Sequence, residues 1–402
     1  MPTWATVTVL CSLLALHNAQ RMAPVALYEE LRVRLAVDYV GVGYLFGAYL
    51  IAYALCNIPA GMLADRIDAR KLVAVGAALS VAASVVFATA TSYPIAIAAR
   101  MVLGLAGALI YVPSVRFVVA NFPKARRGTV MGFLEMGAGA GQILALTLLP
   151  FLAGQWDLTR AFLALPLFGV LVLGGIFLGL PPTRPVASPN AHGELRLLLR
   201  SSRFWDLIAF QFLGMLAIYA ISGWLPTFAR VDFGYTAVQA GLVGALVNVS
   251  LSLFSPLAGV ISDRMRSRPP VLLAGALLMA ACLAVLAISR DSTVLLVTAF
   301  LAGVSTAFSI PVFVIYVGES FAAAGAGLAV SVAITIGQVA SSLSGPLFGY
   351  TLEMTGTFVA VWGLALITAV LRIPFLFGGR QRLAAEAPAA GFSRETRKRI
   401  DR

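Results

Sequence analysis

Twelve long apolar segments constrain the fold of this chain more than any other feature of its sequence. They cover approximately residues 4–27, 39–63, 71–90, 93–120, 128–152, 160–180, 204–228, 237–261, 270–289, 293–317, 325–350 and 356–378. Each has the roughly 20 mostly apolar residues that a helix needs to cross a bilayer. The segments lack the alternation of membrane strands, and only helices satisfy their own backbone within lipid. We therefore predict an all-α protein with twelve transmembrane helices.

The composition excludes a soluble protein. The chain is 60% hydrophobic and 11% charged, whereas soluble domains have about 25% charged residues. The net charge of +12 does not indicate nucleic acid, because membrane proteins collect Lys and Arg in cytoplasmic loops. We expect no nucleic-acid partner, no cofactor and no metal site, since Cys11, Cys56 and Cys282 are scattered through apolar segments. No nucleophile–base motif or phosphate loop suggests an enzyme. The first segment is expected to stay as a span, because no basic residue precedes it.

The longest polar break, residues 181–203, divides the apolar segments six plus six. We expect an N-terminal bundle (1–180), a cytoplasmic linker (181–203), a C-terminal bundle (204–378) and a basic cytoplasmic tail (379–402). Alternate loops, taken with the tail, carry 20 Lys and Arg, and the opposite loops carry five. This asymmetry predicts that both termini are cytoplasmic in a multi-pass protein of the cell (inner) membrane.

An internal repeat relates the two halves. The stretch GMLADRIDARK starts at Gly61, and the similar stretch GVISDRMRSRP starts 198 residues later at Gly259. Pro113 and Pro311 are also 198 residues apart. Several matches at nearly one offset indicate duplication.

At this point the sequence resembles a major facilitator superfamily transporter over its whole length. The family signature G-x-x-x-D-R-x-G-x-R-[RK] is matched by Gly61, Asp65, Arg66, Arg70 and Lys71. The one departure is Asp68, where Gly is usual. That Gly is expected to serve a turn with positive φ, which Asp tolerates better than most residues. The stretch from Arg100 to Gly104 resembles the family's R-x-x-x-G element, and FPKARRGTVMG (122–132) resembles its next loop.

The resemblance implies two gate motifs on the cytoplasmic side. Asp65 and Arg66 would latch the N-terminal bundle to segment 325–350 when that side is shut. In the second copy, marked by Gly259, Asp263 and Arg264 would act likewise against segment 128–152. The alternative is that these charges only fix the topology of the chain.

Ionisable groups within spans are costly and are therefore functional candidates. His17 and Arg21 are four residues apart and therefore lie on one face of the helix. Asn18 adds a further polar side chain beside them. Arg21 is the first choice for binding an anion, because a guanidinium binds a carboxylate through two hydrogen bonds. The alternative is that Arg21 extends to the outer interface. His17 either carries a proton or is a packed, hydrogen-bonded residue.

Three further charges lie in the N-terminal half. Arg100 matches the family's arginine in the fourth segment, which implies a role in substrate binding or coupling. Arg116 and Glu135 are expected at similar depth, either as a structural or gating pair or with Glu135 coupling protons. Because Arg100 and Arg116 are 16 residues apart, they lie about 160° apart around a straight helix. Both therefore cannot face one cavity.

The C-terminal half offers neutral polar groups instead. Asp206, Glu319 and Arg372 are expected near span ends, where they can reach water. Tyr219, Asn248 and Gln338 are the predicted substrate contacts from this half. The alternative is that they cross-link neighbouring helices.

The resemblance implies a secondary transporter that works by alternating access, and we expect it to be a monomer. The excess of arginine over carboxylate within the spans favours a small organic anion as its substrate, with transport coupled to protons. A drug/proton antiporter exporting lipophilic compounds is the alternative. A receptor built on the same fold has no support from the sequence.

The charges within their spans distinguish the narrower families of such transporters. Organophosphate antiporters pair the first-segment Arg with a basic residue in the seventh, and nitrate porters carry Arg in the second and eighth; both features are absent here. Sugar porters have a large central domain that residues 181–203 do not provide. A monocarboxylate-type substrate remains as the prediction.

Overall fold

The computed structural model describes residues 4–64, 66–182, 198–265, 267–321 and 326–377, and these described parts are helical apart from short turns. The N-terminal helices are α1 (Trp4–Met22), η1 (Val25–Leu27), α2 (Tyr28–Leu35), α3 (Tyr39–Ala64), α4 (Ala69–Thr89), α5 (Tyr93–Asn121), α6 (Lys124–Gln155) and α7 (Leu158–Gly179). The C-terminal helices are α9 (Ser202–Phe233), α10 (Ala237–Arg264), α11 (Pro269–Ile288), α12 (Ser292–Ser320), α13 (Ala326–Thr355) and α14 (Phe358–Leu371). The predicted all-α membrane fold is confirmed.

Eleven of the described helices are long and apolar enough to cross a membrane. The twelfth predicted span, α1, falls outside that set because its last turns carry His17, Asn18, Gln20 and Arg21. All four of these polar residues lie inside the protein, where three of them are buried. The polarity of α1 therefore reflects internal contacts and not exposure to water.

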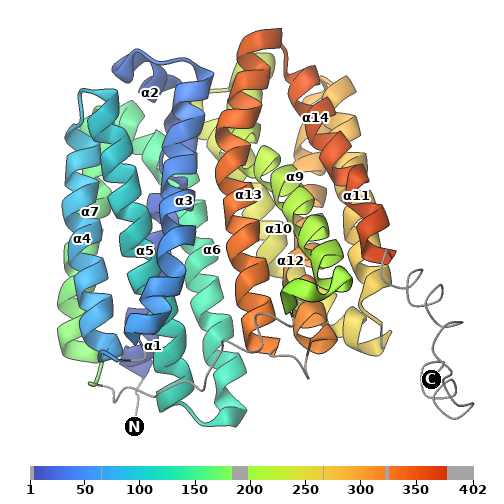
Figure 1. The fold of residues 1–402 in the computed structure, drawn as a ribbon. Coiled ribbons are helices and arrows are strands. Elements are labelled where there is room, and N and C mark those ends of the chain that lie inside the picture. The colour runs from blue at the N-terminus through green and yellow to red at the C-terminus, as the bar shows by residue number, and fades with distance from the viewer. Residues whose placement is uncertain (1–3, 65, 183–197, 266, 322–325, 378–402) are drawn as a thin grey trace, which may run out of the picture.

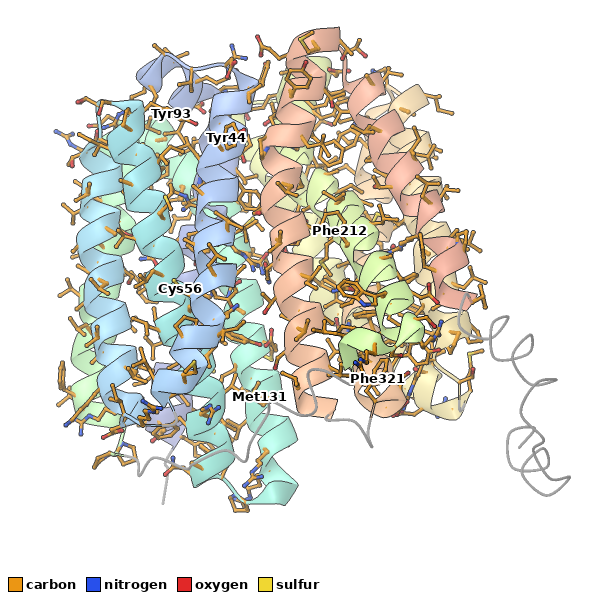
Figure 2. All side chains as sticks on the ribbon, in the orientation of Figure 1. Tyr44, Cys56, Tyr93, Met131, Phe212 and Phe321 are labelled. Carbon is orange, nitrogen blue, oxygen red and sulfur yellow. The ribbon has the colours of Figure 1, made fainter. Side chains whose placement is uncertain are left out.

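The helices form two bundles that stand side by side, α1–α7 in one and α9–α14 in the other (Figure 1). Carbon-rich side chains project from the outer faces of both bundles (Figure 2), as a lipid environment requires. We call the end of the molecule that carries α2 the α2 end. The opposite end, where α3 ends at Ala64 and α4 begins at Ala69, is called the basic end.

Two symmetric helix pairs join the bundles near the α2 end. A Cβ added to Gly43 of α3 would collide with the backbone of Gly345 of α13. A Cβ added to Gly241 of α10 would collide with the carbonyl of Leu146 of α6. Gly241 lies 198 residues after Gly43, and Gly345 lies 199 residues after Leu146. The internal repeat therefore appears in space as two equivalent close contacts between bundles.

The bundles separate toward the basic end. Gly47 packs tightly against α13, but Ile58, eleven residues further along the same face of α3, is 60% exposed. On α13, Gly345 packs against α3, but Ile334, also eleven residues away on the same face, is 39% exposed. The interior is therefore closed at the α2 end and open at the basic end.

Three details of the predicted elements are wrong. The first span ends at Met22 and is followed by η1 and the short helix α2, which the sequence analysis took as span and loop. Helix α6 begins at Lys124, so the basic loop continues as helix. Asp68 has a negative φ and caps α4 by accepting a hydrogen bond from the Arg70 amide, so no positive φ is required there. Asp65 lies outside the described residues.

Candidate functional site

Arg21 extends from the last turn of α1 into the space between the bundles. It interacts electrostatically with Tyr49 and Tyr53 of α3, Tyr219 of α9 and Glu135 of α6. Its side chain is half-buried, and its Nε has no hydrogen-bond partner in the described parts of the chain. A guanidinium with an unpartnered Nε and aromatic hydroxyl neighbours from both bundles is suited to bind an anion.

His17 lies one turn before Arg21 in α1, within a cluster of tyrosines. Its Nδ1 is 2.6 Å from the Tyr49 hydroxyl, which also donates to the His17 carbonyl at 3.2 Å. The rings of Tyr53 and Tyr111 lie 5.3 and 6.5 Å from the imidazole. Gly107 of α5 makes room, because a Cβ there would lie 2.5 Å from the imidazole ring. His17 is therefore a packed, hydrogen-bonded residue that positions Tyr49.

Glu135 faces the opening between the bundles. It lies eleven residues before Leu146, which packs against α10, so it occupies the same face of α6 three turns nearer the basic end. Its carboxylate is exposed and accepts a 3.3 Å hydrogen bond from Tyr111. Arg21 is the cation that acts on it electrostatically.

Tyr111 of α5 is the described hydrogen-bond donor to the Glu135 carboxylate. Arg116 lies five residues after Tyr111, about 140° away around the helix. The pairing of Arg116 with Glu135 stays a prediction.

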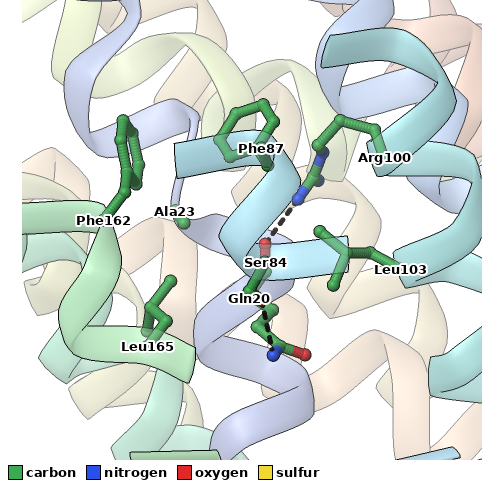
Figure 3. Close-up of a pocket in the computed structure, with 8 residues that line it drawn as sticks. All are labelled: Gln20, Ala23, Ser84, Phe87, Arg100, Leu103, Phe162 and Leu165. Atoms are coloured by element: carbon green, nitrogen blue, oxygen red, sulfur yellow. Dashed lines mark hydrogen bonds between the residues drawn. The ribbon is translucent and has the colours of Figure 1, made fainter. Parts of the chain in front are cut away.

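Arg100 is fully buried and fixes the end of α1 (Figure 3). Its guanidinium donates to the carbonyls of Gln20 at 2.6 Å, Leu45 at 2.8 Å and Arg21 at 3.1 Å. It also lies 4.6 Å from the centre of the Tyr49 ring. The carbonyls at a helix C-terminus have no partners within the helix. Arg100 therefore caps α1 and positions Arg21. The three hydrogen bonds of its guanidinium go to backbone carbonyls.

The other predicted contacts are spread over several helices. Asn18 is buried, donates to the Leu14 carbonyl at 2.9 Å and accepts from Gln142 of α6 at 3.4 Å. Asn248 donates to its own helix at Gly244, 3.2 Å away. Both thus have protein partners in this state. Tyr219 packs on Phe46 across the bundle interface, with ring centres 5.9 Å apart. Gln338 of α13 has a buried Oε1 without a partner among described residues.

The first gate motif lies at the basic end, where the bundles are apart. Arg66 and Lys71 are exposed, and Arg70 donates to the Phe177 carbonyl of α7 at 2.8 Å. A Cβ added to Gly61 would meet only one atom, 4.0 Å away. The contact that the resemblance implies between this motif and α13 belongs to the opposite, shut state.

The second gate motif forms an ion cluster within its own bundle. Arg268 binds Asp263 at 2.6 Å and Glu319 of α12 at 2.7 Å, while Arg264 is exposed. Hydrogen bonds to Glu319 and Asp263 raise the pKa of Arg268 above its ordinary value. A Cβ added to Gly259 would meet open space. Asp263 therefore pairs with Arg268 of its own bundle in this state.

Several relevant residues were missed or misplaced by the sequence analysis. Tyr49, Tyr53 and Tyr111 were not singled out, although Tyr49 and Tyr53 recur at four-residue spacing on one span. Arg372 was expected to reach water, but it is buried against Phe210 of α9. The sequence gives no signal that an arginine near a predicted span end will be buried by a neighbouring helix.

The family model described as Major Facilitator Superfamily matches residues 9–251 and 230–399. The chain belongs to the Major Facilitator Superfamily. It is therefore a multi-pass membrane transporter and not an enzyme, as the resemblance implied.

Individual relatives of this superfamily member are distant. The "Probable galactarate/D-glucarate transporter GudP" of Bacillus subtilis is 24% identical over 94% of this chain and 93% of its own length. The "Probable nitrate/nitrite transporter NarK2" of Mycobacterium tuberculosis is 30% identical over 58% of this chain and 60% of its own. A bacterial homologue of the human lysosomal transporter Spinster has a TM-score of 0.78 at 14% identity, covering 93% of this chain and 96% of its own. The structure of a D-xylose–proton symporter has a TM-score of 0.74 at 18% identity, covering 92% of this chain and 97% of its own.

Proposed function

We propose that this transporter moves a small organic anion carrying one carboxylate, and that Arg21 binds that carboxylate. The observation that carries the proposal is the half-buried Arg21 guanidinium, whose Nε has no partner within the described chain and which faces residues of both bundles. A single guanidinium can balance one carboxylate, whereas a dianion would leave one charge desolvated without a counter-ion.

The surrounding polar groups favour a hydroxylated anion. Tyr53 and Tyr219 present phenol groups beside Arg21. Asn57 Oδ1 of α3 and Gln338 Oε1 of α13 are buried acceptors without partners in the described structure, and substrate hydroxyls would supply the missing donors. The relative in Bacillus subtilis is named for galactarate and D-glucarate, which are hydroxylated anions but carry two carboxylates each, so the similarity supports the hydroxyl groups and not the number of carboxylates.

Proton coupling is assigned to Glu135. The carboxylate is exposed at the opening and interacts electrostatically with Arg21. When ionised, Glu135 competes with the substrate for Arg21. When protonated, it leaves the guanidinium free for the substrate carboxylate, so anion and proton bind together.

The orientation follows from the basic residues. We place the basic end and both termini in the cytoplasm of the cell membrane, so the structure corresponds to the state open to the cytoplasm. The protein is proposed to work as a monomer, with its two bundles rocking about the central site. The gate motifs containing Gly61 and Gly259 would close the basic end in the other state.

Uptake into proteoliposomes tests this proposal. The panel contains gluconate, lactate, glucarate, nitrate, xylose and the lipophilic cation tetraphenylphosphonium. We expect gluconate to be taken up fastest, with accumulation driven by an inward proton gradient. Transport of tetraphenylphosphonium alone would overturn the proposal and would favour the drug/proton antiporter, with Glu135 as the site of the cation.

A further inference from the structure

Two buried aromatic residues, each with a hydrogen-bond donor, pack against each other where the bundles close at the α2 end. Tyr28 of α2 is 1% exposed and Trp224 of α9 is fully buried. The Tyr28 hydroxyl and the Trp224 Nε1 have no hydrogen-bond partner among the residues that the structure describes. Their ring centres are 5.5 Å apart. One donor comes from each bundle, so the pair spans the closed interface.

The closure itself does not need these donors. The ring of Tyr39 also packs on Trp224, with ring centres 6.1 Å apart, and the Tyr39 amide donates to Glu353 of α13 at 3.2 Å. A phenylalanine at position 28 would fill the same space. Burying a hydroxyl or an indole N–H without an acceptor costs free energy. Opening of the interface would expose the two donors to an acceptor that the closed interface does not provide.

The pair also lies between the α2 end and Arg21. Trp224 is nine residues before the end of α9 at Phe233, about 13 Å along the helix. Tyr219, which interacts with Arg21, lies five residues deeper on the same helix. A solute that travels from the α2 end to Arg21 must pass the level of Trp224.

We propose that Tyr28 and Trp224 form an outer subsite that binds the substrate carboxylate when the bundles part at the α2 end. The inference rests on the proposed transport of an organic anion and adds a second binding position to it. Both groups donate hydrogen bonds, and carboxylate oxygens accept them. Neither carries a charge, so the subsite holds the anion weakly and releases it to Arg21.

The test compares Tyr28→Phe with Tyr39→Phe, because both rings pack on Trp224 but only the Tyr28 hydroxyl is without a partner. Gluconate uptake is measured in right-side-out and inside-out membrane vesicles, which present opposite ends of the protein. We expect Tyr28→Phe to raise the half-saturating gluconate concentration three- to tenfold at the α2 end and to leave it unchanged at the basic end. Tyr39→Phe should change neither value.

A thermal-unfolding measurement on the same variants separates binding from structure. Tyr28→Phe should melt at or above the wild-type temperature, because it removes a donor that has no partner in the closed interface. A lower melting temperature, or an equal change in half-saturation at both ends, would overturn the subsite. If wild type does not transport gluconate at all, the proposed function fails with it; if wild type transports normally and Tyr28→Phe behaves identically, only the subsite fails.

Discussion

The Glu30 carboxylate of α2 accepts a 2.7 Å hydrogen bond from Arg230 of α9, and this ion pair joins the two bundles at the closed α2 end. Both side chains are about one-quarter exposed, so the pair is worth about 1 kcal/mol. We predict that Glu30→Gln shifts the equilibrium about fivefold toward the state open at the α2 end. Distances between spin labels on the two bundles would measure the shift.

Glu29→Gln is the matched control for that shift. Glu29 pairs with Arg32 within α2 at 3.9 Å and does not join the bundles. If both variants change the distance distribution equally, the effect comes from the charge of α2 and the latch between bundles is wrong.

Loss of Arg100 should destabilise the protein. Arg100→Gln leaves three buried carbonyls, those of Gln20, Arg21 and Leu45, without their donors, and each unmet group costs about 1–3 kcal/mol. We expect a clearly lower melting temperature in detergent. Arg160→Gln, which alters an exposed pair with Asp157, should change it little. An unaltered melting temperature in Arg100→Gln would contradict the capping role.

Glu135→Gln should keep substrate transport but abolish its coupling to the proton gradient. A glutamine keeps a hydrogen-bonding group for Tyr111 but cannot change its charge. We expect exchange of substrate across the membrane to continue while accumulation driven by a proton gradient is lost. Asp157→Asn, at an exposed position of the α2 end, should keep both. Gradient-driven accumulation in Glu135→Gln would remove Glu135 from the coupling step.

The glycines at the two ends should respond differently to substitution. Gly43→Val collides with the backbone of Gly345 and should destabilise this state, whereas Gly259→Val meets open space. We therefore expect Gly259→Val to melt like wild type yet to transport several-fold more slowly, because the basic end must close against that face. Normal transport by Gly259→Val would mean that the motif does not approach the other bundle.

The spans were predictable because a bilayer imposes length and apolarity on every crossing segment. Helix α10, predicted as 237–261, runs from Ala237 to Arg264, and α5, predicted as 93–120, runs from Tyr93 to Asn121. Such features are local, since composition within one segment determines them.

Pairings between segments were not predictable in the same way. Glu30 and Arg230 are 200 residues apart, and no local pattern connects them. Arg100 resembled a binding residue because a buried guanidinium and a ligand-binding guanidinium look alike in sequence. Only the positions of the Gln20 and Leu45 carbonyls distinguish the two roles. The tyrosines around His17 were missed because an uncharged aromatic residue is ordinary in a membrane span.

The central claim, that Arg21 binds the carboxylate of the substrate, is tested most directly by thermal unfolding of wild type and Arg21→Gln with and without gluconate. A ligand that binds the native state at 100 times its Kd stabilises it by about 2.7 kcal/mol. We predict that saturating gluconate raises the melting temperature of wild type, while Arg21→Gln folds but shows no shift. Equal stabilisation of both proteins by gluconate would place the carboxylate elsewhere and would contradict the account.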